Sequence, residues 1–193
     1  LHQDVHSFPT RRSSDLQFIF ETGLLKQFKS YDSLLQTPLC VVFKYDLLFG
    51  SAGATTPLIY HTNERRYVYA CGGKINVKLA PWRSHKYMVI NKDYANYEFA
   101  SPLNVWSPQD EYKTGYNKMK FLDVIVPDGH MLYVPPYWFY SIMFEKDNHE
   151  TAVYQFDYGS VMNVGANMWN LAQHMYARLG PKTVASDPSG NVL

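Results

Sequence analysis

The sequence predicts a mainly β protein, built as a closed barrel or as two packed sheets, with short helices before and after the strands. Between residues 39 and 157, short runs rich in Val, Ile, Tyr and Phe alternate with turns rich in Gly, Pro, Asn and Asp. Only one clear helical pattern follows these runs, whereas a parallel sheet would need a helix between successive strands. We therefore expect a single antiparallel β domain.

The first expected element is a short helix within residues 17–38. Leu24, Leu25, Phe28 and Tyr31 have the spacing of one helical face. Nine strands are then expected, because each run combines β-forming residues with flanking turn residues. These runs are 39–45, 57–61, 66–71, 74–79, 87–90, 121–126, 131–134, 138–144 and 151–157.

Two turns and one long insertion connect the expected strands. Gly72-Gly73 separates two alternating runs, which predicts a tight β-hairpin at residues 71–74. Asp128-Gly129 predicts a second turn. Residues 91–120 contain Pro, Gly and several Asn, so we expect an insertion loop over one barrel face that is functional or mobile.

The last expected element is a helix over 161–179, stopped by Gly180-Pro181. Its apolar stripe packs on the barrel in one interpretation and forms a dimer seam in the other. The barrel domain would then span 39–180, followed by a flexible tail at 181–193. The residues of this stripe are Val161, Val164, Met168, Leu171, Met175 and Leu179.

Residues 6–16 read like the translation of a common short-read sequencing adapter. We therefore exclude residues 1–16 from the fold as an artefact, with a disordered polar arm as the alternative. In the first interpretation the authentic N-terminus is missing from this sequence.

Composition excludes several classes of partner. The chain carries 18 basic and 17 acidic residues, a net charge of +1, and this balance gives no electrostatic case for nucleic acid or an anionic membrane. No apolar run approaches the roughly 20 residues that span a bilayer. Cys40 and Cys71 lie in apolar runs and are expected to be free thiols in a reducing compartment, which favours an intracellular, cytoplasmic location.

Two segments have the layout of an iron-binding oxygenase site: Thr56-Pro57-Leu58-Ile59-Tyr60-His61 and the run from Gly129 to Tyr140, which contains Pro135-Pro136-Tyr137-Trp138. This frame resembles the JmjC-type branch of the cupins, in the 2-oxoglutarate/Fe(II) hydroxylase superfamily, and its asparaginyl-hydroxylase-like members. In that branch a His-x-Asp pair after Thr-Pro and a distant His after Pro-x-x-Trp-(aromatic) bind the metal. The likeness runs from about residue 46 through 158 and implies a double-stranded β-helix, or jelly-roll barrel.

The resemblance places Ile59, His61 and Tyr140 at the three ligand positions. Residues 59 and 61 face the same side of a strand, because alternate side chains point the same way. Ile59 cannot bind a metal, and a protonated tyrosine is a poor Fe(II) ligand. His61 alone could donate a nitrogen, and His130 is the one nearby imidazole that could complete a non-standard site.

The resemblance also implies residues for the cosubstrate. Lys74 falls where the family places the lysine that pairs with the distal carboxylate of 2-oxoglutarate, and Thr56 falls where a hydroxyl assists it. Gln155 falls where members carry an asparagine that faces the cosubstrate. In the alternative interpretation Lys74 caps the exposed end of the hairpin and Gln155 is a buried polar residue bonded to backbone.

Three hypotheses follow. The leading one is a cupin-like domain that has lost its iron site, needs no cofactor, and binds a protein or small molecule, or forms a homodimer through the C-terminal helix. The second is an active Fe(II)/2-oxoglutarate-dependent hydroxylase with an altered metal shell that uses His61 and waters, with or without His130. The third is a non-catalytic binder of a small dicarboxylate through Lys74.

Overall fold

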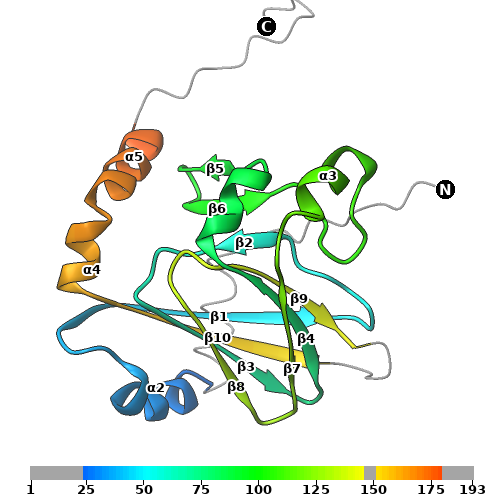
Figure 1. The fold of residues 1–193 in the computed structure, drawn as a ribbon. Helices are drawn as coiled ribbons and strands as arrows, with labels where there is room; N and C mark the ends of the chain where they lie inside the picture. The colour runs from blue at the N-terminus through cyan, green and yellow to red at the C-terminus, as the bar shows by residue number, and fades with distance from the viewer. Residues whose placement is uncertain (1–23, 146–150, 180–193) are drawn as a thin grey trace, which may run out of the picture.

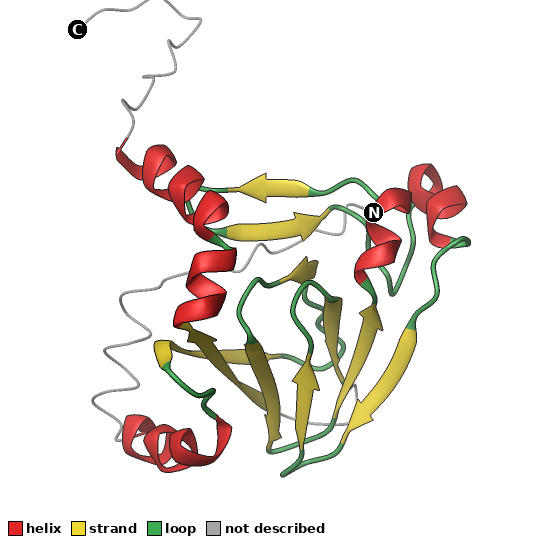
Figure 2. Cartoon of the chain, turned by 60° about the vertical axis from the view of Figure 1, so that its left-hand side comes forward, coloured by secondary structure: helices red, strands yellow, loops and turns green. Residues whose placement is uncertain are grey.

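Two antiparallel sheets pack face to face in the computed structural model, which describes residues 24–145 and 151–179 (Figures 1 and 2). The expectations for residues 1–16 and for the tail at 181–193 lie outside the described residues. The first sheet has the order β1 (Cys40–Gly50), β10 (Thr151–Ser160), β3 (Arg65–Cys71) and β8 (Met131–Val134). The second has the order β5 (Asn91–Asp93), β6 (Glu98–Ser101), β2 (Leu58–Tyr60), β9 (Phe139–Phe144), β4 (Ile75–Ala80) and β7 (Leu122–Val126).

The strand order is that of a jelly roll. Apart from β5 and β6, the chain alternates between the sheets at every connection except the one from β4 to β7, which stays in the second sheet. The resulting orders, β1-β10-β3-β8 and β2-β9-β4-β7, are those of a double-stranded β-helix, the architecture that cupins share. The fold class expected from the sequence is therefore confirmed.

The main core lies between the two sheets. Val68 and Ala70 of β3 and Ile75, Val77 and Leu79 of β4 are all buried, while the residues between them along each strand are only partly buried. This alternation places every second side chain in the space between the sheets, where the two inner faces interdigitate. Both strands therefore contribute to one shared core.

The predicted hairpin at residues 71–74 was wrong. β3 pairs with β10 and β8, whereas β4 pairs with β9 and β7, so the turn at Gly72 crosses from one sheet to the other. Gly72 has a φ of 78°, and its N–H donates to the Asp128 carboxylate at 2.8 Å, which ties this crossing to the second predicted turn. Alternation indicates which face of a strand is buried but not which strand lies beside it, so a crossing and a hairpin look alike in the sequence.

Residues 91–120, expected as an insertion loop, contain two strands and a short helix and share a buried cluster with β2, β4 and β9. The β5–β6 hairpin pairs with β2 and widens the second sheet, and a short helix, α3 (Lys113–Tyr116), follows it. Phe99, Leu103, Val105 and Met119 are buried there. Asn91-Lys92-Asp93 escaped detection because this edge strand is exposed and lacks β-forming residues.

The strand expected at 87–90 is also absent. Residues 82–87 instead form a 3-10 helix, and residues 88–90 belong to no helix or strand. Tyr87, Met88 and Ile90 pack against the same cluster as the insertion. Their apolar character therefore reflects burial under this cluster and not a strand.

The first helix, α2 (Leu24–Leu35), lies against the outer face of the first sheet. Leu35 is buried with Phe156 and Tyr158 of β10. The Asp32 carboxylate accepts hydrogen bonds from the Tyr45 hydroxyl at 2.5 Å and the Tyr158 hydroxyl at 2.8 Å. One carboxylate thus fastens the helix to β1 and β10 together.

The predicted C-terminal helix is broken into α4 (Val161–Ala166) and α5 (Met168–Leu179) at Asn167. The Asn167 amide donates to the carbonyls of Thr62 and Asn163, and this tie to the barrel fixes the residue between the helices. Most of the apolar stripe does not pack on the barrel, because Val161, Met168, Met175 and Leu179 are exposed, while Val164 and Leu171 are partly buried. In the part of the chain that the structure describes, no helix has the length and apolarity to span a membrane.

Replacing Asp32 with Ala should lower the free energy of unfolding by about 1–3 kcal/mol, because two partly buried tyrosine hydroxyls lose their acceptor. Urea denaturation measures the change. Asp110→Ala is the matched control, since Asp110 makes only an exposed ion pair with Lys113 and its loss should cost under about 0.5 kcal/mol. Equal effects of the two changes would contradict the role assigned to Asp32.

Candidate functional site

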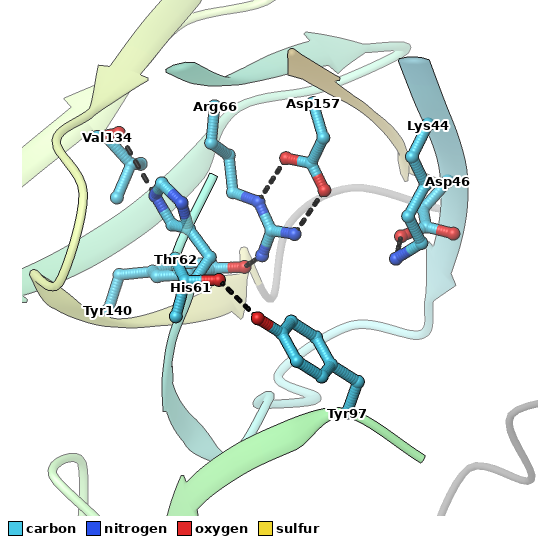
Figure 3. A network of polar contacts seen from close by, with 9 residues as sticks. All are labelled: Lys44, Asp46, His61, Thr62, Arg66, Tyr97, Val134, Tyr140 and Asp157. Carbon is cyan, nitrogen blue, oxygen red and sulfur yellow. Dashed lines mark hydrogen bonds and ion pairs between the residues drawn. The ribbon is translucent and has the colours of Figure 1, made fainter. Parts of the chain in front are cut away.

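The structure brings the three expected ligand positions together at one end of the barrel. Ile59 of β2 and Tyr140 of β9 are direct cross-strand partners. His61 directly follows β2, and its ring centroid lies 6.4 Å from that of Tyr140 (Figure 3). Positions 59, 61 and 140 therefore surround one region between the sheets.

A buried ion pair from the opposite sheet fills this region. Arg66 of β3 and Asp157 of β10 are register partners, and the Nε and Nη2 atoms of Arg66 donate to both carboxylate oxygens of Asp157. The third guanidinium nitrogen, Nη1, donates to the Tyr140 hydroxyl. The exposed fractions are 7% for Arg66, 1% for Asp157 and 0% for Tyr140, so one guanidinium links the two sheets inside the core (Figure 3).

The two charges stabilise each other. Burial raises the pKa of Asp157, but the neighbouring Arg66 outweighs this effect and holds the pKa below its ordinary value. Burial likewise opposes the charge of Arg66, yet Asp157 raises its pKa above the usual range. Burial also raises the pKa of Tyr140, although Arg66 acts in the opposite direction. At neutral pH the site therefore holds a guanidinium, a carboxylate and a protonated phenol.

His61 is neutral in this environment. Its side chain is buried, and burial first, then repulsion by Arg66, lowers its pKa to about 3. Nε2 lies 3.1 Å from the Val134 carbonyl oxygen, so this nitrogen carries the proton and donates it. The backbone of Asn63 slightly favours the charged ring, but no atom of the described residues makes a regular hydrogen bond to Nδ1.

The side chains present do not fit an iron ion. Ile59 has no donor atom, the Tyr140 hydroxyl is protonated and receives Arg66, and both oxygens of Asp157 are engaged. Only one nitrogen of His61 is left, whereas a non-haem Fe(II) site uses two imidazoles and a carboxylate. Over residues 24–145 and 151–179, no three His, Cys, Asp or Glu side chains are grouped so that they could hold a metal ion.

Electrostatics points in the same direction. A divalent cation about 5 Å from a guanidinium is repelled by about 7 kcal/mol at an effective dielectric constant of about 20. The carboxylate of Asp157 lies against this guanidinium and offsets part of the repulsion, so the charge of Arg66 and the shortage of donor atoms act together against a metal.

The expected cosubstrate residues are not gathered here. The Thr56 hydroxyl accepts from the Ile142 N–H at 2.9 Å and so bridges to β9. Lys74 directly precedes β4, and its side chain is 50% exposed. Its ammonium lies 2.9 Å from the Glu145 carboxylate. Gln155, in contrast, is buried two residues from Asp157 on the inner face of β10.

His130 and His61 lie at opposite ends of β8. His130 is exposed in the turn before this strand, with Nδ1 3.0 Å from the Asp128 carbonyl. The carbonyl that receives His61 belongs to Val134, four residues further on, a separation of roughly 13 Å along a strand. The two imidazoles are therefore not brought together.

Polar contacts close the barrel end next to His61. The Thr62 hydroxyl lies 3.1 Å from the Tyr97 hydroxyl of the insertion, and the amide of Asn163 donates to the Thr62 carbonyl at 2.9 Å. Tyr97 and Tyr137 have positive φ values of 56° and 60°, an uncommon conformation for a non-glycine residue. The insertion and α4 thus cover this end with strained backbone nearby.

Sequence reasoning missed Arg66 and Asp157. The strand pattern did indicate that both residues point into the barrel. Arg66 lies two residues from the inward-facing Val68, and Asp157 lies two residues from the inward-facing Gln155. A charged residue at an inward strand position needs a partner. The partner itself could not be identified, because the two residues are 91 positions apart and meet only through the β3–β10 pairing.

Comparison with known proteins adds little beyond the fold. No protein-family model and no curated protein matches the chain. Among solved structures, it is similar to a hydroquinone 1,2-dioxygenase from Sphingomonas sp. TTNP3 with 4-hydroxybenzoate bound (14% identity, 62% of this chain and 60% of that one, TM-score 0.39). It is also similar to a recombinant oxalate oxidase in complex with glycolate (10%, 60% and 41%, 0.36) and to Peruvianin-I, a cysteine peptidase from Thevetia peruviana latex (9%, 60% and 50%, 0.36).

The chain thus spans 60% or less of the length of these structures. Similarity at this level says nothing about chemistry. The strand order and the side chains of the site define the class: a cupin-like jelly roll with a buried ion pair at one end of the barrel.

Removing one partner of the buried pair should be strongly destabilising. Arg66→Met should lower the free energy of unfolding by about 3–5 kcal/mol, since Asp157 is left charged and unpaired. Combining Arg66→Met with Asp157→Leu should cost less than Arg66→Met alone. The control is Lys113→Met, which breaks an exposed pair. Urea denaturation compares these three variants with the wild type. A similar loss of stability for Arg66→Met and Lys113→Met would contradict the burial argument.

The buried neutral imidazole should make the protein less stable in acid. The unfolded chain protonates His61 near pH 6.5, whereas the folded chain does so only near pH 3, so stability should fall by about 1.4 kcal/mol per pH unit below 6.5. Asp157 has a lowered pKa, and its contribution is lost only below about pH 4, outside this window. Urea midpoints measured from pH 7 to 4.5 should fall less steeply for His61→Gln, whereas a change at the exposed His130, His130→Gln, should leave the slope unaltered.

Proposed function

We propose that this chain is a cupin-like domain, related to the JmjC-type branch, whose barrel holds no catalytic iron and serves a binding or structural role. The observation that carries the proposal is the Arg66–Asp157 pair, bonded to Tyr140 in the region that positions 59, 61 and 140 surround. Chemistry of the 2-oxoglutarate type needs a metal that binds the cosubstrate and activates oxygen. The side chains at this end supply too few donors for one.

The two alternatives have weaker support. An active hydroxylase with an altered metal shell would have His61 as its one imidazole beside the guanidinium of Arg66, because His130 lies at the opposite end of β8, and waters would have to supply the other ligands. A dicarboxylate binder that uses Lys74 would have to bind at a half-exposed position where Glu145 already pairs with the ammonium. Both alternatives therefore depend on rearrangements that the observed contacts oppose.

Anaerobic reconstitution with Fe(II) tests the proposal. The wild-type protein should bind no stoichiometric iron, and added 2-oxoglutarate and oxygen should give no succinate above the level of a protein-free control. Iron bound one to one, together with oxygen-dependent turnover of 2-oxoglutarate, would contradict the proposal.

A second copy of the chain is the partner that the C-terminal helices favour. Trp169, Tyr176 and Leu179 of α5 are exposed by 73–79%, and their spacing puts them on one face of the helix. On the same helix, His174 contacts the Tyr94 carbonyl and stacks edge-on against Tyr97, so α5 rests on the insertion by another side. The apolar face carries no charged residue, and two copies could pack against each other without repulsion.

Light scattering after size exclusion measures the predicted dimer. The wild-type chain should elute as a dimer at micromolar concentration, and Trp169→Glu with Tyr176→Glu should convert it to a monomer. Ile125→Glu is the control, because Ile125 is similarly exposed but lies on β7 of the second sheet. A wild-type monomer at these concentrations would exclude the dimer.

A further inference from the structure

We infer that Arg66 is a resident cation that takes the place of a metal ion, so that restoring the three ligand residues alone would not restore a metal site. This inference rests on the proposed loss of the iron site. It adds Arg66 of β3 to the three ligand positions 59, 61 and 140, which lie on or next to β2 and β9. Its basis is the set of contacts and charges around the guanidinium.

The contacts of Arg66 include one of the ligand positions. Three guanidinium nitrogens donate to Asp157 and to the Tyr140 hydroxyl, and the Arg66 Cζ atom lies 5.6 Å from the centroid of the Tyr140 ring. A change at position 140 therefore alters the environment of the guanidinium directly. With Tyr140 replaced by an imidazole ligand, Arg66 would lose an acceptor and would remain next to the new donor with its charge intact.

The charges at this end are already balanced. Lys44 of β1 is the register partner of Asp157, and Asp46 is the partner of Gln155. Lys44 and Asp46 pair with each other at 2.5 Å and are both partly exposed at the rim (Figure 3). Together with Arg66 and Asp157 they make two positive and two negative groups, while His61 and Tyr140 are neutral.

A divalent cation changes this balance in a way that can be counted. Replacing Ile59 with His, His61 with Asp and Tyr140 with His adds one negative charge, and a bound divalent ion adds two positive charges. The cluster would then carry one excess positive charge in a buried place, which is costly. Replacing Arg66 with Met removes this excess and frees the carboxylate of Asp157 beside the ion.

Four proteins separate the contributions: the wild type, the triple variant Ile59→His/His61→Asp/Tyr140→His, the triple variant with Arg66→Met, and the triple variant with Arg65→Met as the matched control. Arg65 is the adjacent arginine, but its guanidinium donates to the Leu35 and Gln36 carbonyls away from the barrel interior. Co²⁺ is the probe, and its binding is followed by calorimetry and by the visible absorption of the ion.

The variant with Arg66→Met should bind one Co²⁺ per chain at least 100-fold more tightly than the triple variant and the Arg65→Met control. Equal affinity of the triple variant and the Arg66→Met variant would overturn the role of Arg66. Absence of binding in both would overturn the inference as well, because the positions would then not form a site. If the Arg66→Met variant does not fold without metal, refolding that depends on Co²⁺ supports the inference, and failure to refold with Co²⁺ overturns it.

The wild type separates this inference from the proposed function. Stoichiometric Co²⁺ binding by the wild type would refute the proposed loss of the metal site. If the wild type binds no Co²⁺, and the triple variant binds it as tightly as the triple variant with Arg66→Met, only the role of Arg66 is refuted.

Discussion

The guanidinium of Arg66 is the interaction on which the candidate site depends. It joins β3 and β10 of the first sheet to β9 of the second through Asp157 and Tyr140, and all three of these side chains are buried. A buried charge is tolerated only when it is paired and hydrogen-bonded. Here Nε, Nη1 and Nη2 of the guanidinium each donate a hydrogen bond. Arg66 holds the pKa of Asp157 below its ordinary value, whereas burial is the first cause of the lowered pKa of His61 and of the raised pKa of Tyr140.

The pair also explains how a jelly-roll barrel of this kind can remain closed at its polar end without a metal. A metal ion would join side chains from β2 and β9 through coordination bonds. In this chain, the hydrogen bond from Nη1 of Arg66 to the Tyr140 hydroxyl joins the two sheets at that end, while Asp157 binds the same guanidinium within the first sheet. The apolar half of the barrel, with Val68, Ile75 and Val77, needs no such device because it is held by ordinary packing.

Much of the fold follows from local patterns, whereas the site depends on pairings that local patterns do not encode. Alternation located β3, β4 and β9, but could not show that the turn at Gly72 crosses between sheets. The family resemblance grouped positions 59, 61 and 140, and in the structure Ile59 pairs with Tyr140 while the His61 ring lies 6.4 Å from the Tyr140 ring. Lys74 shows the opposite case: the alternation of Ile75, Val77 and Leu79 gives Lys74 the outward parity, so the family resemblance and not the strand pattern suggested an inward lysine.

An anomalous-scattering crystal structure of the wild-type protein grown with excess Co²⁺ tests the central claim most directly. The account predicts that both oxygens of Asp157 still receive Arg66, that Nη1 of Arg66 still donates to Tyr140, and that no anomalous peak lies between His61 and Tyr140. A peak coordinated by His61, with Arg66 displaced from Asp157, would contradict it.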